Sequence, residues 1–92
     1  MVTAFVLITA KRDQIPETAE ALSALEGVAE VHSVAGPFDI VAVIRVKTNE
    51  QLADLVTSHL LKIKGIERTE TLIAFRAFSK FDLERMFSIG MD

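Results

Sequence analysis

Apolar residues along the chain follow two spacings, one typical of strands and the other of helices. Four short runs rich in β-branched and aromatic residues predict β-strands: 2–9, 28–35, 38–46 and 66–78. Between them, apolar residues recur every three or four positions over 15–26 and 49–64, which predicts two amphipathic helices. The predicted order is therefore β-α-β-β-α-β.

Residues at the ends of both helical segments support these boundaries. Pro16 lies near the first turn of the first segment, and Gly27 follows its end as a C′ residue. The second segment starts with the capping-box pattern Thr48-Asn-Glu-Gln51 and stops at Gly65.

An internal repeat indicates how these elements fold together. The pattern Leu22-x-x-Leu25-x-Gly27-Val28 recurs 38 residues later as Leu60-x-x-Ile63-x-Gly65-Ile66. A duplicated β-α-β unit predicts an α+β, ferredoxin-like split β-α-β fold, in which two helices pack on one face of a four-stranded antiparallel sheet. We expect one domain over residues 1–78. Residues 79–92 are expected to form a tail or short helix that either docks on a neighbouring subunit or frays in solution.

The predicted strands are apolar on both faces, although two helices can cover only one. In the first strand, Phe5 and Leu7 lie on one face of the sheet, and Val6 and Ile8 lie on the other. The third strand, 38–46, also has apolar residues on both faces. In a sheet with one face exposed to water, apolar and polar residues normally alternate along each strand. Because these strands are apolar at successive positions, the second face of the sheet needs a cover. We expect a second copy of the chain to supply it, by sheet-on-sheet packing or by strand pairing at an edge.

Composition narrows the possible functions. The 92 residues carry a net charge of −3, without the basic field that a nucleic acid attracts. The absence of Cys excludes disulfides and thiolate chemistry, and no apolar run is long enough to span a membrane. We expect a cytoplasmic protein with no direct nucleic-acid or membrane partner.

Two polar patterns could bind a small molecule. In the turn between the second and third strands, Gly36 could offer its N–H to a ligand carboxylate, and Asp39 could receive a ligand ammonium, as an α-amino acid requires. A plain hairpin turn with a capping Asp explains the same residues. Thr69 and Thr71 lie two positions apart and therefore share one side of the last strand, where they could bind a polar ligand or simply be strand residues.

The histidines are the remaining candidates for chemistry. His59 falls on the apolar face predicted for the second helix, where it could be a general base or a haem ligand, and His32 lies on the second strand. A packed core histidine is the simpler interpretation of His59, because no Cys or second His stands at metal-ligand spacing. We expect no catalytic residue, metal or cofactor.

Taken together, these residues resemble a known family. The stretch Val31-x-Ser33-Val34-x-Gly36-x-x-Asp39, followed much later by Thr69-x-Thr71-x-Ile73, is similar to the effector-binding (RAM) domain of the Lrp/AsnC feast/famine transcription regulators. The resemblance covers about residues 2–78 and implies a dimeric α+β barrel of two packed sheets, assembled into an octamer or a similar ring. It also implies that Gly36, Asp39, Thr69, Thr71 and, more weakly, Ser33 contact an amino-acid effector.

These observations lead to one functional hypothesis and two alternatives. Family members carry a helix-turn-helix before this domain, whereas this chain starts at the first strand, so we expect a non-enzymatic, amino-acid-sensing oligomer. It would regulate transcription indirectly, by binding an effector or by mixing with full-length Lrp/AsnC regulators. The alternatives are a small monooxygenase-like enzyme of the dimeric α+β barrel type and a regulatory subunit of the ACT type.

Overall fold

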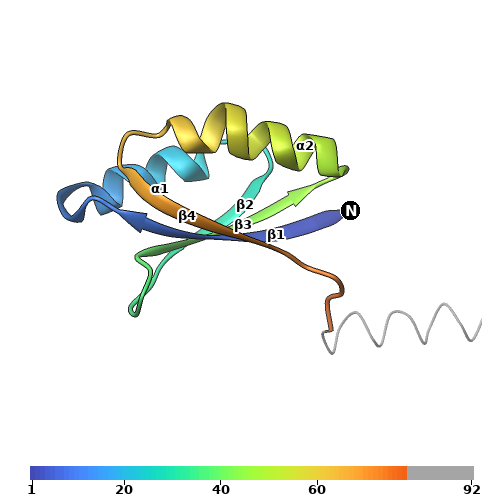
Figure 1. Ribbon diagram of the computed structural model, residues 1–92, viewed down its shortest axis with the longest axis horizontal. Coiled ribbons are helices and arrows are strands. Elements are labelled where there is room, and N and C mark those ends of the chain that lie inside the picture. The colour runs from blue at the N-terminus through green and yellow to red at the C-terminus, as the bar shows by residue number, and fades with distance from the viewer. Residues whose placement is uncertain (79–92) are drawn as a thin grey trace, which may run out of the picture.

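The computed structural model describes residues 1–78, and the tail predicted at 79–92 lies outside the described residues. The strands are β1 (Val2–Ala10), β2 (Val28–Ser33), β3 (Ile40–Val46) and β4 (Ile66–Ile73). They form one antiparallel sheet in the order β2-β3-β1-β4. Helices α1 (Ile15–Ser23) and α2 (Asn49–Asp54) lie on the same side of it (Figure 1). The predicted ferredoxin-like α+β fold is confirmed.

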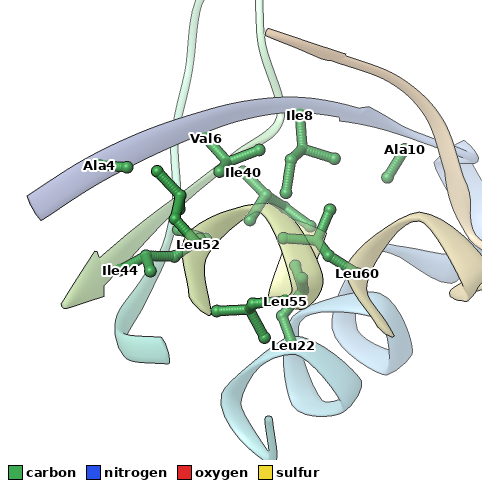
Figure 2. Packing of buried hydrophobic residues seen from close by; sticks show 11 residues of the cluster. Ala4, Val6, Ile8, Ala10, Leu22, Ile40, Ile44, Leu52, Leu55 and Leu60 are labelled. Carbon is green, nitrogen blue, oxygen red and sulfur yellow. The ribbon is translucent and has the colours of Figure 1, made fainter. Parts of the chain in front are cut away.

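The hydrophobic core lies between the sheet and the helices. β1 and β3 contribute the side chains at their even-numbered positions, and Leu22, Leu52, Leu55 and Leu60 meet them from the helical layer (Figure 2). Pairing across the sheet explains this selection, because Ile8 lies opposite Ile40 and residues directly opposite each other share one face.

Several element boundaries were predicted wrongly. β2 and β4 end at Ser33 and Ile73, earlier than predicted, and β3 begins at Ile40 rather than at position 38. Helix α1 stops at Ser23, and Gly27 lies in the turn before β2 with a φ of 99°. The apolar composition continues past each true end, so composition alone overestimates these lengths.

The second helical segment changes its winding partway along. α2 is followed by a π-helical turn over Leu55–His59 and a 3₁₀ turn over Leu60–Lys62. The predicted cap is present, since Thr48 Oγ1 accepts the Gln51 N–H at 3.1 Å and Gln51 Oε1 accepts the Lys47 N–H at 2.8 Å. A π-turn adds one residue to a turn and therefore rotates the residues after it relative to an ideal α-helix.

The face of the sheet away from the helices carries apolar side chains at its centre. Phe5 lies opposite Val43 on one side and Leu72 on the other, and these three residues form a row across the sheet. Phe5 is 37% exposed and Leu72 is 47% exposed. Neither helix reaches this face (Figure 1). This surface around Phe5, Val43 and Leu72, with Leu7 and Val41 beside them, is called the open face.

Candidate functional site

The turn between β2 and β3 projects beyond the sheet at the end where β1 finishes (Figure 1). It is closed at its base by a hydrogen bond from the Val34 N–H to the Asp39 carbonyl oxygen at 2.9 Å. At its tip, Gly36 has a φ of 127°, which L-residues with a side chain rarely adopt. Nothing lies within 4 Å of the position where a Cβ would stand, so Gly36 is required by its backbone conformation and not by crowding.

Asp39 connects this turn to the neighbouring strand β1. Its N–H donates to the Ile8 carbonyl oxygen at 2.9 Å, and its carboxylate oxygen Oδ2 accepts the Ala10 N–H at 2.9 Å. Asp39 is half-buried, so these bonds are partly shielded from water. The carboxylate that was predicted to meet a ligand ammonium is therefore already bonded to a backbone amide 29 residues away.

Ser33 and Thr69 belong to the same row of the sheet but lie at opposite edges. Ser33 pairs with Ile40, Ile40 with Ile8, and Ile8 with Thr69. Three inter-strand spacings separate the two outer residues, which amounts to about 14 Å. An amino acid is shorter than this, so one protomer does not bring Ser33 and Thr69 to a single ligand.

The two threonines share a face, as the spacing predicts. Thr69 lies opposite Ile8 and Thr71 opposite Val6, and both partners are fully buried beneath the helices. Thr69 is half-buried and Thr71 is exposed, because β4 is an edge strand. The predicted residues thus form two groups, the turn group of Ser33, Gly36 and Asp39 and the strand group of Thr69 and Thr71.

His59 does not lie on the apolar face, and this prediction was wrong. Its side chain is 55% exposed, and Nε2 lies 3.7 Å from Asp54 Oδ2. The π-turn is the physical reason, since residues five apart face each other in a π-helix but not in an α-helix. His32, on β2, is also exposed and lies 3.7 Å from Glu30.

A cleft of about 790 Å³ opens at the other end of the sheet from the turn group. It lies between the α1–β2 turn, the end of β3 and α2, and its lining includes Gly27, Arg45, Asp54 and His59. None of the five predicted ligand contacts lines it.

Sequence reasoning missed the partners of Asp39. These partners are the backbone groups of Ile8 and Ala10, which every residue type possesses, so no sequence signal could have identified them.

In the part of the chain that the structure describes, no helix is long and apolar enough to cross a membrane. No group of three or more His, Cys, Asp or Glu side chains is placed to hold a metal ion among residues 1–78.

Comparison with known proteins agrees with the fold. Residues 3–82 match the family model of the Lrp/AsnC ligand binding domain. A protein of Thermus thermophilus, known from its crystal structure, is 50% identical with a TM-score of 0.81, covering 87% of this chain and all of that one. A feast or famine regulatory protein from M. tuberculosis, solved in complex with L-methionine, is 28% identical with a TM-score of 0.70, covering 87% of this chain and 54% of that one.

A longer relative has the same domain as part of a larger protein. An uncharacterised HTH-type transcriptional regulator of Pyrococcus furiosus is 40% identical over 76 residues, which is 79% of this chain. The match covers 51% of the relative, so the chain spans about half the length of that regulator.

The fold and the family match together define a small α+β ligand-binding domain. The chain belongs to the Lrp/AsnC ligand-binding domain family.

Proposed function

We propose that this protein binds an α-amino acid at the turn group and transmits its presence through self-association, without catalysing a reaction. The observation that carries the proposal is the Gly36 turn, which is exposed at its tip and anchored by Asp39 at its base. Among residues 1–78, the Gly36 N–H has no backbone acceptor, so it is available to a ligand carboxylate. The L-methionine complex of the related regulator from M. tuberculosis supports this ligand class.

A second copy of the chain completes the proposed site. Since about 14 Å separates Ser33 from Thr69 within a protomer, an amino acid that contacts both of these residues receives one of them from a neighbouring subunit. Binding then stabilises whichever assembly brings the two groups together, which links ligand concentration to oligomeric state.

The open face supports dimerisation as the first step of assembly. Its apolar centre is bordered by polar and charged residues at its edges, with Glu30 and His32 on β2 and Glu70 on β4. An apolar centre with a polar rim is typical of protein interfaces. We propose a homodimer with packed sheets, which associates further into an octamer or a similar ring.

The proposed role in the cell is indirect control of transcription in the cytoplasm, by effector binding or by mixed assembly with longer Lrp/AsnC regulators. The net charge of −3 gives no support to direct nucleic-acid binding by these 92 residues. The exposure of His59 weighs against the monooxygenase-like alternative, because its imidazole is open to solvent rather than enclosed with a substrate.

Isothermal titration calorimetry with each of the twenty amino acids tests the proposal. We expect at least one to bind, with unchanged amino acid recovered after prolonged incubation. Failure of all twenty to bind at millimolar concentration would exclude an effector role. Conversion of the ligand would show that the protein is an enzyme.

A further inference from the structure

The hydrogen bonds of Asp39 point to a different role from the one that its chemistry first suggests. An aspartate just past a glycine turn could receive a ligand ammonium. In the structure, however, Asp39 contacts the protein in three directions through its N–H, its carbonyl oxygen and its carboxylate. Two of these contacts reach β1, at Ile8 and Ala10, and the third closes the turn at Val34.

The Asp39 carboxylate accepts a backbone N–H of β1 at a point where β3 offers no carbonyl oxygen to it. The last residue pair between β1 and β3 is Ile8 with Ile40, so the Ala10 N–H lies beyond the ladder on that side. Ala10 is 7% exposed, and a buried amide without an acceptor is costly. Asp39 Oδ2 accepts this N–H at 2.9 Å, and a charged acceptor makes the bond stronger than a neutral one would.

The next peptide extends this connection to the strand group. The Lys11 N–H donates to the Gly65 carbonyl oxygen at 2.8 Å, directly before β4 begins at Ile66. The bonds from Asp39 to Ala10 and from Lys11 to Gly65 therefore cross the end of the sheet. They connect the turn group to the segment entering β4 through the end of β1.

We infer that Asp39 is a positioning residue for the amino-acid site and does not bind the ligand's ammonium. It holds the 34–39 turn against the end of β1, so that the Gly36 N–H is presented in one orientation, and it fixes that turn relative to the start of β4. The inference rests on the proposed function for its ligand, whereas the anchoring itself is a property of the free protein.

Two substitutions separate the two roles. Asp39→Asn removes the charge but keeps an oxygen that can accept the Ala10 N–H, whereas Asp39→Ala removes both. For a positioning role, we expect the dissociation constant of the amino acid to change by less than about threefold in Asp39→Asn. We expect it to rise by about tenfold or more in Asp39→Ala. Asp13→Asn, on an exposed residue outside the turn, is the matched control and leaves binding unchanged.

Hydrogen–deuterium exchange of the free protein at single-residue resolution gives the readout that is independent of ligand. The Ala10 amide should stay protected in Asp39→Asn and exchange faster in Asp39→Ala, while amides in α2 keep their wild-type rates. Where Asp39→Ala does not fold, Asp39→Glu takes its place, because the longer stem displaces the carboxylate.

The possible outcomes are distinct. If Asp39→Asn keeps Ala10 protected but loses binding as severely as Asp39→Ala, the charge contacts the ligand and the inference is wrong. If Ala10 stays protected in Asp39→Ala, the anchoring is absent and the inference is again wrong. If the wild-type protein binds none of the twenty amino acids, the proposed function fails, while the exchange rates of Ala10 still decide whether Asp39 anchors the turn.

Discussion

Gly65 lies against the hydroxyl of Thr18, so closely that a Cβ on Gly65 would be far nearer to Thr18 Oγ1 than van der Waals contact allows. Thr18 is 2% exposed, and its hydroxyl has no hydrogen-bond partner among residues 1–78. Helix α1 and the segment entering β4 therefore touch at a position where only glycine fits. Because the Gly65 carbonyl also accepts the Lys11 N–H, this contact sets how β4 joins β1.

We therefore predict that Gly65→Ala lowers the free energy of unfolding by about 2 kcal/mol, as overpacking of a filled interior does. Thr18→Ala removes the buried, unpartnered hydroxyl and should leave stability equal or higher. The double variant should recover part of the loss. Urea denaturation at a fixed protein concentration measures all three variants, and additive effects in the double variant would show that the two residues do not interact.

Gly27 and Gly36 both have positive φ angles but differ in their surroundings. A Cβ on Gly27 would stand 3.0 Å from Val46 Cγ1 and 3.1 Å from Leu55 Cδ2, whereas one on Gly36 would meet nothing within 4 Å. Gly36→Ala should therefore cost only the backbone strain, about 1 kcal/mol, and Gly27→Ala should cost more. If thermal or urea unfolding showed the same loss of stability in Gly36→Ala and Gly27→Ala, this prediction would be contradicted.

Leu60 and Leu61 are neighbours with opposite environments. Leu60 is fully buried, and Leu61 is 49% exposed. Leu60→Ala leaves a cavity in the core and should destabilise the protein by about 3 kcal/mol. Leu61→Ala should change stability by less than about 0.5 kcal/mol. Similar values for the two variants would mean that the turns after α2 place these side chains differently.

A charged substitution at the centre of the open face tests whether this surface is a dimer interface. Phe5→Glu places a carboxylate between Val43 and Leu72, where a packed sheet–sheet interface would have to bury it unpaired. Light scattering should show a dimer or larger assembly for the wild type and a smaller mass for Phe5→Glu. Leu61→Glu, on the helical side of the molecule, is the control and should keep the wild-type mass. A wild-type monomer at all concentrations would refute the proposed interface.

Much of the fold could be predicted because the patterning and the duplication agree with each other. The repeat of Gly27 at Gly65, with apolar residues at matching positions, is specific to two related units, and the structure confirms their arrangement. The same reasoning placed His59 wrongly. The π-turn at Leu55–His59 leaves no mark in the apolar spacing, yet it turns that imidazole outward beside Asp54.

The candidate site was predictable only in part, because a sequence shows residue types but not their partners. The spacing correctly placed Thr69 and Thr71 on one face and Gly36 in a turn that requires it. It could not show that a backbone amide occupies the Asp39 carboxylate, or that two core strands separate Ser33 from Thr69. Both facts depend on strand order and register.

The central claim, amino-acid binding at the turn group with help from the strand group of a neighbouring subunit, is tested most directly by hydrogen–deuterium exchange with and without ligand. L-methionine and the other nineteen amino acids are the ligands, each in excess over the protein. We predict that a bound amino acid slows amide exchange at 34–39 and at 69–71. The exchange rates of the residues that line the cleft near Gly27 and His59 should stay unchanged. Protection confined to that cleft, or no protection with any amino acid, would contradict the account.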